Sequence, residues 1–317
     1  MHSFPTLKFS NGVEMPVIGL GTWQSSGDEV RHAVEVAITE ENYPLIDTAE
    51  IYGNEEIIGD ALHKIFTDGK KTRDDVFITT KLWPNNLHPD RSQRAALECL
   101  ARLRLARVDL LLAHFPIVND ADGNEHGASV TVEDVWRGLE SIYDKGLARA
   151  IGVSNFSVQQ IERIMKIARV PIHNAQNELH LYFPQHDLAE MCKKHRIILT
   201  SYGSLGSPGR SNFTLPTGEK WDWADAPSAL DDPTVKKLAA KYGKTPAQVL
   251  LRYVIERGIA VIPKSISSAR IHENIDVFSF ELSKEEVGAL ETAKHRQRLF
   301  LFPFMEGHPE DPFKADR

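Results

Sequence analysis

Eight short apolar runs, each followed by a polar residue and an amphipathic segment, constrain the fold of this chain more than any other feature. The runs, such as 108–112, lack the strict alternation of half-buried strands, which is typical of strands buried on both faces of a parallel sheet. Between them, apolar residues recur at helical spacing, for example at Val132, Val135 and Leu139, and Asp28 is the expected N-cap of the first helix. Strands that alternate with helices predict an α/β fold with a parallel sheet.

The number of runs indicates which α/β fold this is. We place the strands at 17–23, 45–47, 76–82, 108–112, 150–156, 172–176, 197–201 and 261–265. Eight strand–helix units in 317 residues fit a (β/α)8 TIM barrel better than an open doubly wound sheet. The fragment Gly19-Leu20-Gly21 lacks the third glycine of a dinucleotide-binding loop, so we do not expect a Rossmann fold. Neither an internal repeat nor a low-complexity linker divides the chain, and we expect residues 1–317 to form one domain.

Three segments lie outside the eight units. Asn11-Gly12, between alternating residues, predicts a β-hairpin over 7–17. The polar loop 203–232 and the Phe- and Pro-rich tail 299–317 are expected to be largely non-helical and to lie over the mouth of the barrel.

Charge and composition argue against a nucleic-acid-binding, a membrane-spanning or a secreted protein. The net charge of -7 at pH 7 argues against nucleic acid or an anionic membrane as the main partner, because both repel an acidic protein. No apolar run reaches the ~18 residues of a membrane span, and the first residues do not resemble a secretory signal. Two distant cysteines, Cys99 and Cys192, offer neither a disulfide framework nor metal-ligand spacing. We therefore expect a soluble cytoplasmic protein.

Polar side chains lie where several of the predicted strands end, and a barrel carries its chemistry at that end of its strands. Asp47 and Tyr52 follow the second strand. Lys81 lies near the end of the third and His114 follows the fourth, so all four side chains can converge. Taken singly, Lys81 could be a solvated charge or a Schiff-base nucleophile, and His114 is more readily a core histidine. Their joint placement favours catalysis.

This combination of side chains suits the reduction of a carbonyl group. Hydride addition leaves an alkoxide that must take up a proton. A phenol with a pKa near ~10 becomes a useful proton donor if an ammonium group stabilises its anion and an aspartate holds the ammonium in place. A neutral imidazole can donate a hydrogen bond to the substrate oxygen and orient it.

Five motifs occur at or after the strands: 47–55 (DTAEIYGNE), 78–83 (ITTKLW), 112–116 (LAHFP), 152–156 (GVSNF) and 262–265 (IPKS). In this order they resemble the motifs of the aldo-keto reductases, specifically the aldose and aldehyde reductase branch. The resemblance extends from Leu7 to about Phe313, nearly the whole chain. It implies that Tyr52 is the general acid. Asp47 and Lys81 would tune its acidity, and His114 would orient the carbonyl.

The resemblance also implies a cofactor, NADPH rather than NADH, bound in extended form across the barrel mouth. The expected cofactor-binding residues are Thr22, Trp23, Asp47, Ser154, Asn155, Gln176, Tyr202, Gly203, Leu205, Ser207, Lys264, Ser265, Arg270, Glu273 and Asn274. Among them, Tyr202 would stack on the nicotinamide ring. Lys264, Ser265 and Arg270 would hold the 2'-phosphate, since two cations beside a hydroxyl suit a phosphate monoester. The alternative is that Lys264 and Arg270 are solvated charges.

The expected substrate is a small carbonyl compound, an aldehyde above all, with some ketones and aldoses. Its pocket would be lined by Trp23, Ile51, Tyr52, Trp83, His114, Phe115 and Trp221, with Trp223 as an alternative to Trp221. Several features depart from the family pattern, among them a shorter loop at 117–129 and the sequence YGSL at 202–205 in place of the commoner YSPL. Phe115 stands where aldose reductases usually carry tryptophan, and Gly209 stands where many relatives carry an acid that helps to latch a loop over the cofactor.

Two other functions remain open from the sequence. A barrel of this family can act as a non-catalytic NADPH-binding, structural or regulatory protein, and the intact set of four residues does not by itself prove turnover. A lyase that forms a Schiff base on Lys81 is the second, which the partner Asp47 and the phosphate-binding residues disfavour. No metal is expected, because no cluster of ligand residues has suitable spacing. The family branch is mostly monomeric, and we expect a monomer.

Overall fold

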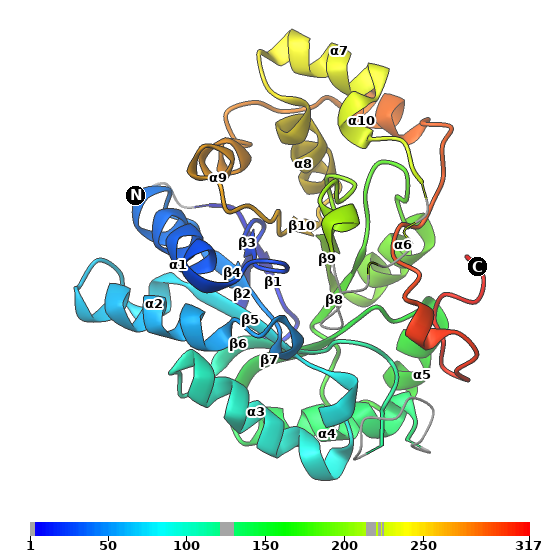
Figure 1. The fold of residues 1–317 in the computed structure, drawn as a ribbon. Helices are drawn as coiled ribbons and strands as arrows, with labels where there is room; N and C mark the ends of the chain where they lie inside the picture. The colour runs from blue at the N-terminus through cyan, green and yellow to red at the C-terminus, as the bar shows by residue number, and fades with distance from the viewer. Residues whose placement is uncertain (1–3, 121–129, 214–219, 221–222, 224) are drawn as a thin grey trace.

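Eight parallel strands form the centre of the protein, which a computed structural model describes for residues 4–120, 130–213, 220, 223 and 225–317 (Figure 1). They are β3 (Leu20–Gly21), β4 (Leu45–Asp47), β5 (Phe77–Leu82), β6 (Val108–Ala113), β7 (Ala148–Ser154), β8 (Asn174–Glu178), β9 (Ile198–Tyr202) and β10 (Ala260–Val261). Each strand pairs with the next along the chain. Parallel bridges from Ile18 to Val261 and from Gly21 to Lys264 join the first strand to the last. The predicted (β/α)8 barrel is confirmed.

Helices surround this barrel (Figure 1). They are α1 (Gly27–Glu35), α2 (Glu55–Thr67), α3 (Pro89–Leu103), α4 (Val132–Asp144), α5 (Val158–Ile167), α6 (His186–His195), α7 (Pro233–Tyr242), α8 (Pro246–Glu256), α9 (Ser268–Ile275) and α10 (Lys284–Glu291). Several of them bury an apolar stripe against the strands, as the fully buried Trp136 of α4 illustrates, whereas α10 packs against α7 and α8. Within the part of the chain described, no helix has the length and apolar character needed to cross a membrane.

The predicted hairpin is confirmed and closes one end of the barrel. Strand β1 (Thr6–Lys8) pairs antiparallel with β2 (Glu14–Pro16). Phe9 and Met15 of this hairpin are buried in one cluster with Leu45, which begins β4. Because the hairpin fills the end where the strands begin, the opposite end, where they finish, is left for the functional residues.

The structure corrects the predicted N-cap and the bounds of several strands. The strands predicted at 17–23, 150–156 and 172–176 are β3 (Leu20–Gly21), β7 (Ala148–Ser154) and β8 (Asn174–Glu178). Ser26, in extended conformation, precedes α1, whereas Asp28 lies in the first turn, where its charge complements the helix dipole but does not cap the helix. The last strand is shorter than the predicted 261–265 because Pro263 has no amide to donate to the sheet. The carbonyl of Pro263 still accepts a hydrogen bond from the Gly21 amide, at 3.1 Å.

The tail 299–317 contains one turn of 3-10 helix, η7 (Pro303–Met305), and is otherwise non-helical, as predicted. It lies next to α5 and α6 (Figure 1), and part of it lines the cavity at the ends of the strands. Arg163 of α5 donates hydrogen bonds to Glu310 at 2.8 and 2.9 Å, and this ion pair fixes the tail to the barrel.

Replacing Gly59 with alanine is expected to lower the free energy of unfolding by about 1–3 kcal/mol, because the added methyl group overpacks a close helix contact. Gly59 of α2 faces α3, where a Cβ would overlap the backbone carbonyl of Arg102 and lie 2.8 Å from the Cα of Leu103. Urea unfolding measures the change. Gly288→Ala is the matched control, since Gly288 of α10 has nothing within 4 Å of its Cβ position. We expect that variant to be neutral or more stable by up to about 1 kcal/mol. Equal stability of the two variants would contradict the close contact.

Candidate active site

A cavity of about 1230 Å³ opens at the ends of the strands. Its lining includes every residue predicted to bind the cofactor, and Lys81 lies directly behind the lining, with its side chain 0% exposed. The predicted substrate-pocket residues line the same cavity except Trp221, which lies outside the described residues. Trp223, the alternative to Trp221, is not among the residues that line the cavity. The structure therefore brings the two predicted groups of residues into one space.

Lys81 is the centre of the polar residues at the base of this cavity. It is the second-last residue of β5, and its Nζ donates to Asp47 Oδ1 at 2.5 Å and to the Thr48 carbonyl at 2.8 Å. Asp47 ends the neighbouring strand β4, and its Oδ2 accepts a hydrogen bond from Gln176 Nε2 at 2.8 Å. The Lys81 ammonium also lies 5.1 Å from the centre of the Tyr52 ring. Residues on three strands thus fix the position of one buried charge.

These contacts determine the protonation states of Lys81 and Tyr52. Burial alone would lower the pKa of Lys81, but Asp47 and the phenol of Tyr52 together raise it above its usual value, so the side chain stays an ammonium ion. Burial raises the pKa of Tyr52, and the charge of Lys81 acts against this rise. At neutral pH the site therefore holds a protonated phenol beside a fixed positive charge, the form needed to give a proton away.

His114 lies beside Tyr52, immediately after β6. Its ring meets the ring of Tyr52 edge-on, with centroids 5.8 Å apart, and that of Trp83 at 5.3 Å. Burial, with the charge of Lys81, lowers the pKa of His114 well below its usual value. The imidazole is therefore neutral. Its Nδ1 has no hydrogen-bond partner among the described residues.

A second hydrogen-bonded group lies at the ends of β7 and β9, where Asn155 follows β7 and Tyr202 is the last residue of β9. Asn155 has a left-handed backbone (φ 63°), and its Nδ2 donates to the carbonyl of His114 at 2.9 Å. The hydroxyl of Tyr202 donates to Asn155 Oδ1 at 2.6 Å. This chain of contacts holds the Tyr202 ring at the cavity wall and leaves Ser154 and Gln176 beside it in the lining.

Lys264, Ser265 and Arg270 line the cavity after β10 and at the start of α9. Ser265 Oγ accepts a hydrogen bond from the Ser267 amide at 3.1 Å, which shapes this loop. Burial lowers the pKa of Lys264, and Arg270 adds to this effect. Two cations held close enough to lower a pKa favour an anionic ligand.

Aromatic rings form the opposite wall. Trp83 packs edge-on against Phe115, with ring centroids 5.4 Å apart. Phe300 also lines the cavity and packs edge-on at 5.3 Å against Trp223, which does not itself line the cavity. Ile51 is half exposed at the rim. The sequence analysis did not identify three aromatic residues of the tail that also line the cavity, which are Phe300, Phe302 and Phe304. Extended-strand periodicity could not have found them as a set, because Phe302 has a positive φ and Phe304 lies in η7.

Two carboxylates, the partly buried Glu50 and the buried Glu178, also escaped prediction. Glu50 accepts a hydrogen bond from the Trp83 amide at 2.9 Å and so positions that ring. Glu178, the last residue of β8, accepts from the amides of Leu299 and Phe300 at 2.6 and 3.0 Å. Both carboxylates accept hydrogen bonds from backbone amides of the segments that carry the aromatic wall. Among the described residues, no group of three or more His, Cys, Asp or Glu side chains is placed to hold a metal ion.

Comparison with known proteins agrees with this geometry. Residues 17–295 match the model of the aldo/keto reductase family. Aldo-keto reductase family 1 member A1 of Gallus gallus is 37% identical over 322 residues, covering 96% of this chain and 95% of that protein. The Homo sapiens protein of the same name is 38% identical, and the match covers 95% of this chain and 96% of that protein.

Solved structures give the same result. The aldose reductase of Schistosoma japonicum has a TM-score of 0.88 and 37% identity, covering 99% of this chain and 100% of that one. An aldo-keto reductase of Bombyx mori, solved in complex with NADP, has a TM-score of 0.88 and 35% identity. The match covers 98% of this chain and 100% of that one.

Proposed function

The chain belongs to the aldo-keto reductase family, and from this premise we propose that it reduces aldehydes, with some ketones and aldoses, to alcohols by using NADPH. One observation carries the proposal. The buried Asp47–Lys81 pair lies against the phenol of Tyr52, and the cavity that Tyr52 lines also reaches Lys264 and Arg270. Proton-donating groups and phosphate-binding cations therefore share one space.

The residues present fit the proposed cofactor. Lys264 and Arg270 supply the charge for a 2'-phosphate, and Ser265 adds a hydroxyl. Ser154 and Gln176 offer the hydrogen bonds that a carboxamide needs, beside the ring of Tyr202. When bound, NADPH supplies the hydride that the chain itself lacks.

Each residue of the buried group has a defined task in this proposal. Tyr52 gives its proton to the oxygen of the reduced carbonyl as negative charge develops there. Lys81 stabilises the phenolate that remains, and Asp47 holds Lys81 in place. The neutral His114 donates a hydrogen bond to the same oxygen and orients the substrate. The aromatic wall excludes water from the transfer.

A Schiff-base lyase is disfavoured by the state of Lys81. Nucleophilic attack needs a free amine, whereas this ammonium is paired with Asp47 at 2.5 Å and its pKa is raised. Its Nζ also donates to the Thr48 carbonyl and faces the Tyr52 ring, so it is not presented to the cavity.

The test is NADPH consumption with a panel of short, aromatic and sugar aldehydes, together with NADPH binding followed by fluorescence. We expect binding and turnover of several aldehydes. Binding without turnover of any aldehyde would favour a non-catalytic role, and failure to bind either nicotinamide cofactor would refute the proposal.

NADPH affinity is expected to fall as pH rises, beginning below the pH at which an ordinary lysine loses its charge. Burial and Arg270 lower the pKa of free Lys264, against the opposing charge of Glu29. A bound phosphate favours the ammonium form, so binding takes up a proton at high pH and weakens there. Fluorescence titrations from about pH 7 to about pH 10 measure the effect, which Lys264→Met should abolish. An unchanged slope in that variant would assign the pH dependence to another group.

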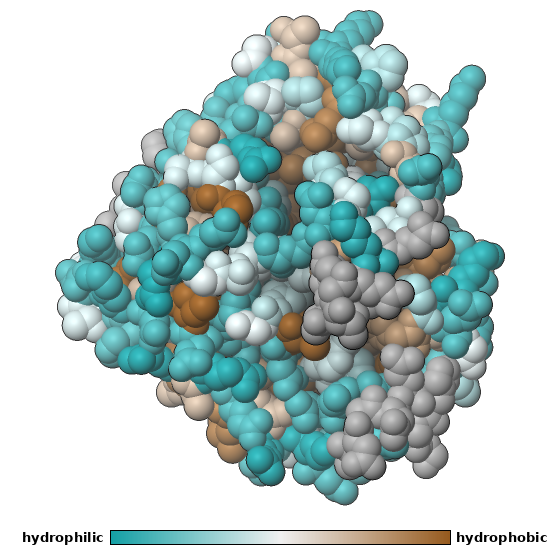
Figure 2. Space-filling view, in the orientation of Figure 1, coloured by the Kyte–Doolittle hydropathy of each residue, from teal (hydrophilic) through white to brown (hydrophobic). Residues whose placement is uncertain are grey.

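We also propose that the protein is a cytoplasmic monomer. Large apolar side chains that are exposed, Ile51, Leu97 and Ile167, are scattered among the described residues, and the face in Figure 2 carries apolar groups in small separate areas. Cys99 and Cys192 are buried free thiols, compatible with a reducing compartment. Light scattering of the purified protein tests the first point, and imaging of a tagged protein in cells tests the second.

A further inference from the structure

The aromatic wall of the cavity contains a residue in an unusual backbone conformation. Phe302 has φ 44° and ψ 91°, although it is a bulky L-amino acid. Side chains with a Cβ rarely adopt positive φ, and such a conformation persists only where the surroundings hold it. Phe302 lines the cavity, and its ring packs edge-on against Phe115 with centroids 4.9 Å apart. The contacts that hold the backbone of Phe302 therefore determine where its ring lies in the wall of the substrate site.

One clamp acts just before Phe302. The Glu178 carboxylate, 0% exposed at the end of β8, accepts hydrogen bonds from the amides of Leu299 and Phe300. Its Oε1 is also 2.9 Å from His180 Nε2. Because Glu178 belongs to the barrel itself, this contact ties the beginning of the wall segment to the rigid scaffold.

A second clamp acts at Phe302 itself and comes from Arg317. Its Nη2 donates to the carbonyls of Leu301 and Phe302, at 2.7 and 3.1 Å. Its Nε donates to Asp311 Oδ2 at 2.9 Å. The Asp311 side chain is 1% exposed, and its Oδ1 accepts from the amide of Phe313 at 2.9 Å. Arg317 thus links the strained backbone to a buried carboxylate.

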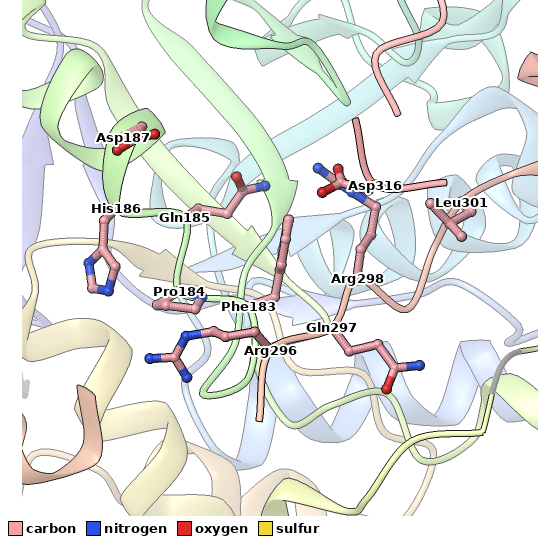
Figure 3. Close-up of a pocket in the computed structure, with 10 residues that line it drawn as sticks. All are labelled: Phe183, Pro184, Gln185, His186, Asp187, Arg296, Gln297, Arg298, Leu301 and Asp316. Atoms are coloured by element: carbon pink, nitrogen blue, oxygen red, sulfur yellow. The ribbon is translucent and has the colours of Figure 1, made fainter. Parts of the chain in front are cut away.

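The outer side of this segment borders a pocket, although the Phe302 ring also packs against Phe313 with centroids 5.7 Å apart and Arg298 pairs with Asp316. The pocket, of about 610 Å³, lies between the turn at Phe183 and the chain from Arg296 to Leu301 (Figure 3). Phe300 and Phe302 face the inner cavity, whereas Leu301 lines this outer pocket. The segment therefore has space into which it can move if the clamp at Phe302 is released.

We propose that Arg317 is a positioning residue for the substrate pocket, which holds Phe302 against Phe115 and so favours carbonyl substrates with a flat aromatic group. This proposal rests on the proposed reductase function. Arg317 does not itself line the cavity, and it acts on the wall through the carbonyls of Leu301 and Phe302. Removing it should leave proton donation by Tyr52 intact and alter only the wall.

Steady-state kinetics of the full-length Arg317→Ala variant with 4-nitrobenzaldehyde and with propanal test the proposal. We expect KM for the aromatic aldehyde to rise about tenfold, the scale of a lost apolar contact in a specificity pocket. The kcat for both aldehydes, the KM for propanal and the Kd for NADPH should stay within about twofold, since their determinants lie elsewhere. Arg317→Lys, which keeps a donor near the carbonyls, should recover part of the effect. Lys314→Ala, in the same tail, is the control and should behave as wild type.

A double variant shows whether Arg317 acts through Phe302. Phe302→Ala should itself raise the aromatic KM, and adding Arg317→Ala should raise it no further, because coupled residues are not additive. An aromatic KM unchanged in Arg317→Ala, an equal rise for propanal, or full additivity with Phe302→Ala would overturn the inference while wild type remains an active reductase. A wild type that reduces neither aldehyde would overturn the proposed function, and this inference with it.

Discussion

Replacing Tyr52 with phenylalanine is expected to lower kcat for aldehyde reduction by about 10²–10⁴-fold, the range that a general acid contributes. Only the proton that the phenol gives to the new alkoxide is lost, while the ring stays between Lys81 and His114. NADPH affinity should stay within about twofold of wild type, since binding does not use that proton. Steady-state kinetics and fluorescence titration separate the two quantities.

The matched control is Tyr143→Phe. Tyr143 is stacked on His173, which also contacts Phe9 of the hairpin at the closed end of the barrel, and it does not line the cavity. Its loss of a hydroxyl should leave kcat unchanged. If Tyr52→Phe retained full kcat, another group would have to donate the proton. If it lost NADPH binding as well, the phenol would serve the structure of the site rather than the reaction.

Removing both Lys264 and Arg270 is expected to weaken NADPH binding by about 10²–10⁴-fold, because each charge-assisted contact contributes about 1.5–3 kcal/mol. NADH lacks the 2'-phosphate, so its affinity should change little. Fluorescence titration of the double alanine variant with both cofactors measures the effect. Lys237→Ala, which removes an exposed cation of α7 that does not line the cavity, is the control.

The ratio of the two affinities is the informative quantity. A parallel loss of NADPH and NADH binding would mean that the two cations stabilise the cavity and do not read the phosphate. No loss for either would place the phosphate elsewhere and would leave Lys264 and Arg270 as solvated charges.

The strand pattern was predictable because it depends on local sequence. Asp47 and Lys81 could be placed together from the sequence, since neighbouring parallel strands end at one side of a barrel and both residues lie at strand ends. The order of the apolar runs fixed the neighbours of each strand. The hairpin was equally local, with its turn at Asn11 and Gly12.

The contacts of the tail could not be predicted in the same way. Strand β8 consists of Asn174–Glu178, a polar sequence, so the predicted strand ended two residues early and Glu178 was not seen as a strand end. The contacts of Glu178 with Phe300, and of Arg317 with Phe302, join segments that no local pattern relates. They form because buried backbone amides and carbonyls require partners, wherever the chain supplies them.

The central claim is that hydride passes directly from NADPH to the carbonyl carbon, with Tyr52 as the proton donor. The most direct measurement uses NADPH deuterated at both C4 positions of the nicotinamide ring and analyses the alcohol product by mass spectrometry. We expect one deuterium per alcohol molecule, on the former carbonyl carbon, and one NADPH consumed for each alcohol formed. An alcohol without deuterium, or NADPH that binds without any alcohol being formed, would contradict the claim.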